Sequence, residues 1–369
     1  MQAKLWVLLG RKAGDNAQVL ALAEATGLPF EEKHISARSW EIVPHLALGP
    51  TLAGIDRGAS SPLGPPWPDL VITAGRRNEP VARWIRARSG GAVRLVHVGR
   101  PWARPSTWDL IVTTPQYFLE DAPNVLQIPL PLRRITRAEV GRAAERIAPR
   151  LAHLPRPLTS VLIGGDSGPF VFTPEKGRRL AEGVNRLVAQ TGGAALVTDS
   201  PRTPKASAQA FRETLAVPAE THWWHDHDTA TDNPYLGFLG MADRFVVTGE
   251  SMSMMAEAAS MARPLYLFDP GDPGMWWRHS HNFRHKPLSH AVAMRLAPRR
   301  MRRDVSRLQD ALRHEGRVRW LDEAPQLIAE GETWAKALQS DPMEDARRAA
   351  ARIRALLDQD AQHRATHPC

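Results

Sequence analysis

Short apolar runs, each followed by a turn and a helical pattern, recur along this chain and constrain its fold more than any other feature. The first five runs are Leu5–Leu9, Leu70–Thr73, Leu95–Val98, Leu110–Val112 and Val125–Ile128. Strands that alternate with helices in this way predict a parallel sheet with helices on both faces. We therefore expect an α/β fold.

A second series of the same kind begins at Ser160. It predicts strands at 161–165 (VLIGG) and 194–198, helices over 174–191 and near 204–215, and a strand–turn–helix–strand unit over 241–268. Before it, residues 136–152 predict an Arg/Ala-rich helix, and LPRPLT at 154–159 predicts a linker. We expect two Rossmann-like domains, 1–153 and 160–330, facing a cleft, because ligands bind at the carboxyl edges of such sheets.

The end of the sequence predicts one more helix, over 340–362. Asp341, Pro342 and Glu344 form a capping-box start. Apolar residues then follow at helical spacing: Met343, Ala346, Ala350, Ile353 and Leu357. We expect an amphipathic closing helix that can cross back to the first domain.

Residues 40–68 fit the strand-and-helix pattern worst, because WEIVPHLALGPTLAGI is apolar without a clear period. We favour a helix that packs in the core. The alternative is a loop that exposes four apolar side chains to a membrane surface or partner: Trp40, Ile42, Leu46 and Leu48.

Charge and cysteine usage narrow the function classes. The net charge of +9 and a pI near 10.2 favour anionic partners. The arginines are scattered rather than interleaved with aromatics, so we do not expect nucleic acid as a partner. Cys369 is the only cysteine, which excludes an internal disulfide and favours a reducing, cytoplasmic compartment.

The sequence shows no membrane-crossing segment and no secretory signal. LWVLLG near the start is too short for a signal core, and no stretch approaches the roughly 18 apolar residues of a membrane span. Peripheral attachment to the inner face of a membrane stays open.

Residues 241–268 predict an anion site. A strand at Arg244–Val247 leads into a polar turn, Thr248–Ser253, and then a helix, so free N–H groups lie where phosphate binds in parallel sheets. Ser251 or Ser253 can contact phosphate or merely cap the helix. Glu257, one helical turn further on, can accept hydrogen bonds from a ribose diol.

Two more turns of the second series resemble anion cradles. GGDSG contains Gly165 and Ser167, and TDSPRT contains Ser200, Arg202 and Thr203. Neither is a Walker loop, and the GxGxxG fingerprint of dinucleotide-binding proteins is missing, which disfavours an NAD enzyme. Asn233, at the start of a predicted helix to Ala242, joins the candidate ligand contacts.

In the first series, four strand ends carry polar residues suited to a ligand. GRKAGDNAQ supplies Gly14 and Asp15, and the later ends supply Arg76, Arg77, Arg100 and Gln116. Asp15 can act as a general base toward an acceptor hydroxyl, or it can be an ordinary helix cap. The arginines offer donors to phosphate or carboxylate.

Two histidine-rich segments raise the question of a metal. His222, His225, Asp226, His227 and Asp228 lie in HWWHDHDTATDNPY, and RHSHNFRH occupies 278–285. Imidazoles and carboxylates can form a site without cysteine. A polar loop is the better interpretation of the first segment, and we expect no metal.

Taken in order, the quoted motifs resemble the mitochondrial fission Elm (elongated mitochondria) family over nearly the whole chain to about residue 330. The resemblance rests on GRKAGDNAQ, PDLVITAGRRNEPVARWIR, VHVGRP, PQYFLEDAPNV, GGDSG, TDSPRTP, NPYLGFLGMADRFVVTGESMSMMAEAA and RPLYLFD. Bacterial members are described as nucleoside-diphosphate-sugar enzymes or glycosyltransferases, and plant members are linked to recruiting the mitochondrial division machinery.

More distantly, the second half resembles the donor domain of GT-B glycosyltransferases. That resemblance implies that Ser167 and TDSPRTP border a nucleotide, that Ser251 and Ser253 approach its diphosphate, and that Glu257 holds its ribose. Usual members read closer to GGPS and SRRTP, so this chain lacks one arginine of the second turn.

The resemblance implies transfer of a sugar from a nucleoside diphosphate donor to an acceptor that can be lipid-linked. Asp15 is then the candidate base, and Arg76, Arg77 and Arg202 offset the charge of the leaving group, with neither metal nor cofactor. The alternatives are a nucleotide-sugar epimerase of the same fold and a non-catalytic adaptor on a membrane surface.

Overall fold

The computed structural model describes residues 3–40, 45, 48–167, 170–226, 233–271, 296, 298, 301–331 and 344–366. The chain divides into two compact units. Unit 1 comprises Met1–Arg134, Pro298–Arg303 and Met343–Cys369, and unit 2 comprises Ile135–Ala297 and Asp304–Pro342. Each unit contains one parallel six-stranded sheet, so the α/β expectation is confirmed.

The sheet of unit 1 has the strand order β2-β1-β3-β4-β5-β6, and every neighbouring pair is parallel. The strands are β1 (Leu5–Leu9), β2 (Phe30–His34), β3 (Leu70–Ala74), β4 (Arg94–Val98), β5 (Leu110–Thr113) and β6 (Val125–Gln127). β2 and β3 lie on opposite sides of β1, so the strand order reverses there. Such a switch point is where ligands bind in open α/β sheets.

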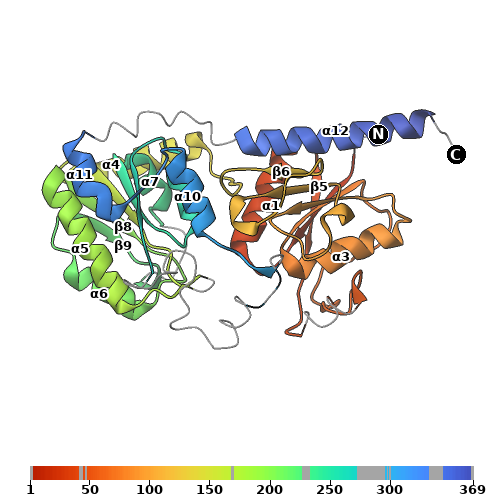
Figure 1. Cartoon of the computed structure of the whole chain (residues 1–369), viewed down its shortest axis with the longest axis horizontal. Helices are drawn as coiled ribbons and strands as arrows, with labels where there is room; N and C mark the ends of the chain where they lie inside the picture. Colours follow the sequence, from red (N-terminus) through yellow and green to blue (C-terminus); the bar gives the residue numbers. More distant parts are fainter. Residues whose placement is uncertain are drawn as a thin grey trace. The chain divides into compact units, whose positions relative to one another are not determined.

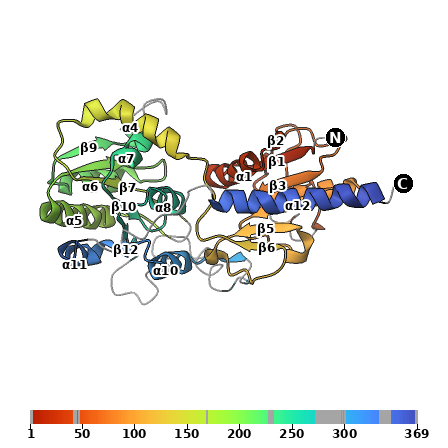
Figure 2. The ribbon, with the colours of Figure 1, turned by 90° about the horizontal axis from the view of Figure 1, so that it is seen from above.

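Helices cover both faces of this sheet because successive residues of its central strands are apolar, which makes both faces apolar. Leu5, Val7 and Leu9 face α1 (Ala13–Thr26) and α12 (Glu344–Thr366), while Trp6 and Leu8 share a core with α3 (Gly75–Arg88). Figures 1 and 2 show α12 running beside α1. The expected return of the closing helix to the first domain is confirmed, with Ala346, Ala350, Ile353 and Leu357 buried; Asp341–Met343 lie outside the described residues.

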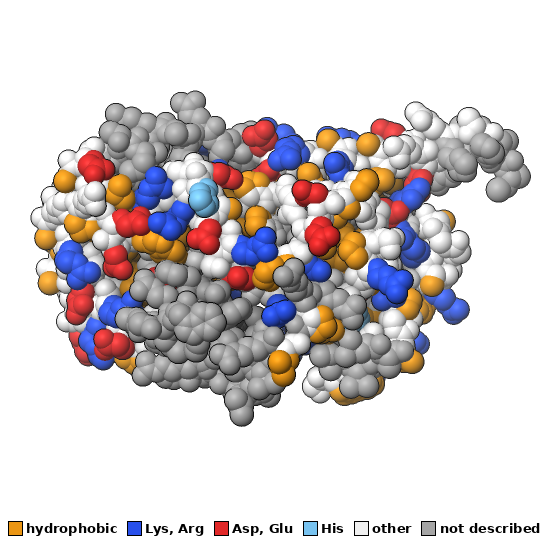
Figure 3. Space-filling view, viewed as in Figure 1, with side chains coloured by type: hydrophobic (Ala, Val, Ile, Leu, Met, Phe, Trp, Pro, Cys, Tyr) orange, Lys and Arg blue, Asp and Glu red, His pale blue; other side chains and the backbone are white. Residues whose placement is uncertain are grey.

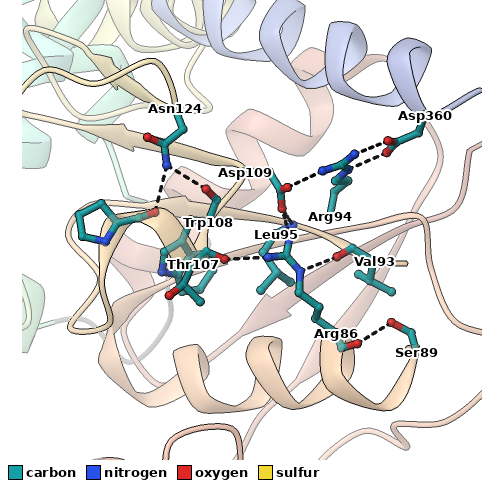
Figure 4. Close-up of polar contacts among 11 residues, drawn as sticks. Arg86, Ser89, Val93, Arg94, Leu95, Thr107, Trp108, Asp109, Asn124 and Asp360 are labelled. Carbon is teal, nitrogen blue, oxygen red and sulfur yellow. Dashed lines mark hydrogen bonds and ion pairs between the residues drawn. The ribbon is translucent and has the colours of Figure 1, made fainter. Parts of the chain in front are cut away.

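A charged network joins α12 to the sheet of unit 1 (Figure 4). The Asp109 carboxylate accepts hydrogen bonds from Arg86, from Arg94 and from the backbone N–H of Leu95. Arg94 also donates from Nε to Asp360 of α12 at 2.7 Å and forms a second contact through Nη2. The bidentate geometry suits a guanidinium and a carboxylate.

In unit 2 the strand order is β12-β11-β10-β7-β8-β9, again all parallel. The strands are β7 (Leu158–Leu162), β8 (Ala194–Thr198), β9 (Ala219–His222), β10 (Arg244–Thr248), β11 (Leu265–Phe268) and β12 (Arg319–Trp320). The order reverses between β7 and β10. The turns that follow these two strands therefore border the switch point of this sheet.

Helices flank the second sheet in two groups. One apolar core joins it to α5 (Pro174–Thr191), α6 (Lys205–Thr214) and α11 (Ala324–Ala329). Another joins it to α4 (Arg137–Leu151) and α7 (Tyr235–Met241). The remaining α-helices described are α8 (Met252–Ala259) and α10 (Ser306–His314), and 3₁₀ turns occupy Pro105–Thr107, Pro115–Tyr117, Trp224–Asp226 and Leu321–Glu323.

Two boundaries differ from the sequence-based expectation. The strand expected at 161–165 runs from Leu158 to Leu162, because Gly164 and Gly165 form a turn. Helix α4, expected in a first domain of 1–153, belongs to unit 2, where it packs closely on α7. A Cβ at Gly237 would lie 2.8 Å from Ile147 Cγ2, and one at Gly240 would lie 2.7 Å from Ala144 Cβ, so only glycine permits this approach.

Of the four apolar side chains near residue 40, the structure describes two. Trp40 is 48% exposed and Leu48 is 60% exposed, which contradicts a fully packed segment, whereas Leu52 and Ile55 are buried. Ile42 and Leu46 lie outside the described residues. The loop alternative therefore describes Trp40 and Leu48 better.

The surface carries mixed charge. On the face drawn in Figure 3, basic side chains are interspersed with acidic ones rather than gathered into one patch. Among the described residues, no helix combines the length and the apolar character that crossing a bilayer requires.

Candidate functional site

Three turns converge at the carboxyl edge of the second sheet. They follow β7 (163–167), β8 (199–203) and β10 (249–251). Gly164 N–H donates to Thr248 Oγ1 at 2.8 Å, and the Ser200 hydroxyl donates to the Gly164 carbonyl. These bonds tie the three turns together at the strand-order reversal, so the predicted cradles GGDSG, TDSPRT and TGES form one cluster, which we call the turn cluster.

The turn that follows β7 requires glycine at both Gly164 and Gly165, because atoms of the two neighbouring turns leave no space for a Cβ. A Cβ at Gly164 would lie 2.4 Å from Glu250 Oε1 and 2.5 Å from Ser251 Cβ. At Gly165, φ is +92° and a Cβ would lie 2.4 Å from the Arg202 carbonyl oxygen. Backbone from one turn thus packs against the other two, which leaves no room for a side chain at either glycine.

Arg202 links the turns through its side chain as well. Its Nη1 donates to the Asp166 carbonyl at 2.8 Å, and its Nη2 lies 3.5 Å from Ser251 Oγ. Ser251 precedes the first residue of α8 and makes no side-chain cap bond there. A guanidinium beside the N-terminus of a helix of eight residues is an arrangement that attracts a diphosphate.

The other predicted contacts in unit 2 flank this cluster. The Thr203 hydroxyl donates to the Ile163 carbonyl and accepts from Ser200 N–H, so Thr203 and Ser200 shape the second turn. Ser167 exchanges backbone hydrogen bonds with Phe170. Ser253 is exposed on the first turn of α8, where helix N–H groups lack intrahelical partners.

Glu257 occupies the last half of α8 and contacts Tyr235. The Tyr235 hydroxyl donates to Glu257 Oε2, and Asn233 Oδ1 accepts the Tyr235 backbone N–H at 2.9 Å. The Asn233 side chain therefore forms an Asx turn at the start of α7. The structure thus places Glu257, the carboxylate predicted to hold the ribose, in contact with Tyr235. The positions of the two residues in the sequence do not reveal this contact.

Glu250 is a residue that sequence reasoning missed. Its side chain is only 1% exposed, Thr248 Oγ1 donates to its Oε1 at 2.9 Å, and it faces Gly164. Burial raises the pKa of Glu250 to about 7, although its own backbone N–H, the charge of Arg202, the Thr248 hydroxyl and the Gly165 N–H limit the rise. A carboxyl that titrates near neutrality inside a turn cluster is typical of a functional site. Its place within TGES assigns it to the turn, but nothing in the sequence shows that this glutamate is buried.

In unit 1, Asp15 lies at the switch point of its own sheet. It sits in the first turn of α1 with its side chain one-third exposed and 4.0 Å from Lys12 Nζ. Gly75, the first residue of α3 directly after β3, adopts φ +74°, and a Cβ there would lie 3.0 Å from Asp15 Oδ2. The helix begins with Lys12 as its N-cap, so Asp15 is not the cap.

The remaining candidates of unit 1 have partners near their strand ends. The Arg76 guanidinium carbon lies 5.0 Å from the centre of the Trp102 ring. Arg77 lines a small recess together with His45 and Thr51. Arg100 donates to the Tyr117 carbonyl at 2.5 Å, and the buried Gln116 donates to Thr114 Oγ1 at 3.0 Å. Gly14 lies in the first turn of α1, where its carbonyl accepts from Gln18. Their roles toward a ligand stay predictions.

Two buried groups of unit 1 hold the edge together. The Glu79 carboxylate accepts the backbone N–H groups of Trp102 and Ala103, both at 2.7 Å, which fixes the loop that carries Arg100. Burial lowers the pKa of His97 to about 3, so this imidazole is neutral at physiological pH. It packs on Trp108 rather than serving as an acid.

The structure describes part of the first histidine-rich segment. His222 is buried, His225 Nε2 contacts the Thr203 carbonyl at 3.2 Å, and Asp226 pairs with Arg212. His227, Asp228 and the segment 278–285 lie outside the described residues. Within the described ranges, no cluster of three or more His, Cys, Asp or Glu side chains is arranged to hold a metal ion.

A cavity of about 370 Å³ opens beside these residues. Its lining includes Asp199, Lys205, Arg212, Trp223 and His225. Burial raises the pKa of Asp199 to about 6, and its Oδ1 accepts the Trp224 N–H at 2.6 Å. The cavity lies next to the turn that follows β8, and its lining combines charged side chains with apolar ones such as Trp223.

Two parallel sheets, each with its switch point lined by polar turns, define a class: α/β proteins with the two-unit fold of GT-B glycosyltransferases and related epimerases. The fold matches a UDP-GlcNAc 2-epimerase from Neisseria meningitidis bound to UDP-GlcNAc, with a TM-score of 0.51 and 10% identity, over 96% of this chain and 100% of that one. It also matches S. aureus MnaA in a co-structure with UDP, with a TM-score of 0.50 and 12% identity, over 97% of both chains.

The chain belongs to the mitochondrial fission ELM1 family, whose model matches residues 13–357. It is 27% identical over 225 residues to the mitochondrial fission protein ELM1 of Arabidopsis thaliana, covering 54% of this chain and 51% of that protein. It is 24% identical over 234 residues to the uncharacterized protein RP120 of Rickettsia prowazekii, covering 55% and 65%. The matched stretch thus spans only about half to two-thirds of each relative.

Proposed function

We propose that this protein is a GT-B-type glycosyltransferase that binds a nucleoside diphosphate sugar in unit 2 and transfers the sugar to an acceptor, for which a lipid-linked molecule is our candidate. The observation that carries the proposal is the turn cluster, where Arg202 and Ser251 meet at the N-terminus of α8. Two solved structures with this fold contain UDP or a UDP-sugar, which adds support to the proposal.

The turn cluster suits the leaving group of such a reaction. Negative charge develops on the diphosphate as its bond to the sugar breaks, and helix N–H groups together with Arg202 would stabilise that charge. Arg76 and Arg77 are our further candidates for the same task. Glu257 would accept hydrogen bonds from the ribose diol, which orients the nucleotide.

For the acceptor we propose Asp15 as the general base. Its carboxylate is partly exposed at the carboxyl edge of the first sheet, where a base can reach a bound hydroxyl. The base removes the proton of the acceptor oxygen as that oxygen forms its bond to the anomeric carbon and the nucleoside diphosphate departs. Asp15→Asn should therefore abolish transfer and leave nucleotide affinity unchanged.

The central test is nucleotide binding by thermal shift, with UDP-, GDP- and ADP-sugars and with CMP-sialic acid, which carries one phosphate instead of two. We expect at least one diphosphate sugar to raise Tm, the CMP compound to do so less, and Glu257→Ala to weaken binding about tenfold or more. Glu182→Ala, at an exposed position on α5, is the matched control. If no diphosphate sugar shifts Tm, the enzyme proposal fails.

Turnover separates the two chemistries that the fold supports. Consumption of the bound nucleotide sugar only after an acceptor is added supports glycosyl transfer. Interconversion of the sugar without an acceptor would replace transfer by epimerisation.

A surface role is a second candidate, because Trp40 and Leu48 expose large apolar side chains on unit 1. Flotation with liposomes containing anionic lipid would test it. Loss of binding in Trp40→Asp, with Trp84→Phe unaffected, would support a membrane-surface adaptor.

A further inference from the structure

The Tyr235–Glu257 contact connects the helix that precedes β10 in the sequence with the helix that follows it. Tyr235 is the first residue of α7, which precedes that strand, and Glu257 lies on α8, which follows it. The phenol hydroxyl donates to Glu257 Oε2. Asn233 fixes the start of α7 by accepting the Tyr235 N–H at 2.9 Å, so the phenol projects from a backbone that is itself held.

The direction of this hydrogen bond is set by chemistry. Burial, reinforced by the neighbouring Glu257 carboxylate, raises the pKa of Tyr235 well above its usual 10. The hydroxyl therefore keeps its proton at any physiological pH and acts as the donor. A carboxylate has about four acceptor positions, so it can accept from Tyr235 and from the hydroxyls of a diol at the same time.

A glutamate side chain has three rotatable bonds, and ordering it costs up to about 2 kcal/mol. A contact that orders it before the ligand arrives removes that cost from binding. The cost matters most for a diol, because two hydroxyls at fixed spacing must both meet their acceptors.

We propose that Tyr235 is a positioning residue of the nucleotide site: its hydroxyl orients the Glu257 carboxylate for a ribose diol and so makes the site selective for ribonucleotides. The inference rests on the proposed function. It assigns Tyr235 no contact with the ligand and no part in the chemical step.

The experiment compares the affinities of UDP and 2′,3′-dideoxy-UDP, which lacks both ribose hydroxyls, by titration calorimetry. The ratio of these affinities measures recognition of the diol. We expect Tyr235→Phe to lower the ratio about five- to tenfold through weaker UDP binding, while the affinity for dideoxy-UDP stays unchanged. Tyr235→Met, which removes the hydroxyl and keeps an apolar side chain, should give the same result and serves if the Phe variant fails to fold.

Two further variants separate positioning from general loosening. In a Glu257→Gln background, Tyr235→Phe should not lower the ratio further, because its effect passes through the carboxylate. Tyr266→Phe, in the fully buried core strand β11, should lower Tm without changing the ratio.

The outcomes are distinct. If wild-type protein binds no nucleoside diphosphate, the proposed function and this inference both fail. If it binds UDP but Tyr235→Phe leaves the ratio unchanged, or weakens UDP and dideoxy-UDP equally, Tyr235 is not a positioning residue and the proposed function stands.

Discussion

Glu250 and Gly164 are packed so closely that a single methyl group would not fit between them, because a Cβ at Gly164 would lie 2.4 Å from Glu250 Oε1. The two residues follow different strands, β10 and β7, and meet where the strand order of the second sheet reverses. The buried carboxyl and the glycine backbone therefore define the shape of the turn cluster together.

Gly164→Ala should displace Glu250 or Ser251 and distort the turn that we assign to phosphate. We expect a loss of stability of about 1–3 kcal/mol and a fall in nucleotide-sugar affinity of tenfold or more. Urea denaturation and calorimetry measure the two quantities. Gly64→Ala is the control, because no atom lies within 4 Å of a Cβ at Gly64 and its φ is not positive. Gly192→Ala would not serve, because φ at Gly192 is +70° and an alanine there is strained. Unchanged affinity in Gly164→Ala would remove this turn from the site.

The titration of Glu250 predicts a pH dependence of stability with a defined sign. The pKa is about 7 in the folded chain against an ordinary value of 4.5, so between these values the folded state binds more protons than the unfolded state. The contribution of Glu250 to the free energy of unfolding is therefore fully present below pH 4.5. It is lost as the pH rises toward 7 and does not change further above that pH. The contribution amounts to about 3 kcal/mol at most.

Glu250→Gln should remove this contribution while keeping the shape of the side chain. We expect the variant to gain stability relative to the wild type on going from pH 5 to pH 8, measured as the difference between urea unfolding free energies. Other titrating groups, including Asp199, cancel in that difference. Parallel pH profiles for the two proteins would show that Glu250 keeps an ordinary pKa.

The contact between α4 and α7 offers a matched pair of glycine substitutions. Gly237→Ala would place its Cβ 2.8 Å from Ile147 Cγ2, and we expect it to cost about 1–3 kcal/mol. Gly141→Ala, inside α4 with open space around its Cβ, should instead stabilise the protein by about 0.5–1 kcal/mol. Thermal melts of both would reveal the difference in sign, and equal effects would contradict the packing of these helices.

The ion pair between Arg94 and Asp360 anchors α12. Asp360→Asn should lower stability by about 1 kcal/mol, a modest value because Arg94 is partly exposed and solvent screens the pair. Asp358→Asn, exposed on the same helix, should change stability by less than about 0.5 kcal/mol. Raising the salt concentration should shrink the difference between the two variants.

The sequence predicted the central strands well and missed three of the four edge strands; the edge strand β6 was predicted from its apolar run. Runs such as Leu5–Leu9 and Leu110–Val112 are apolar throughout because helices bury both faces of the sheet. β2, with the sequence FEEKH, and β9, with AETH, are edge strands whose polar residues meet solvent, so they carry no apolar run. The two-residue β12 is too short to leave a pattern.

Some residues of the candidate site could be predicted from the sequence and others could not. Gly165, Arg202 and Ser251 could be predicted because glycine, arginine and serine at strand ends have a chemical meaning without further structure. Glu250 could not, because nothing in the sequence separates a fully buried glutamate from an exposed one. The attachment of α4 to α7 depends on glycines about a hundred residues away, which local patterns do not relate.

The return of α12 to unit 1 has a consequence for how the chain acquires its structure. Ala21 and Leu22 of α1 share one apolar core with Ala349 and Ile353. During synthesis these partners emerge from the ribosome more than three hundred residues apart, so the apolar surface of the nascent first unit that α12 covers stays exposed until α12 has been made. The core of the first unit is therefore completed only after nearly all of the described chain has been synthesised, and until then its apolar surface favours aggregation.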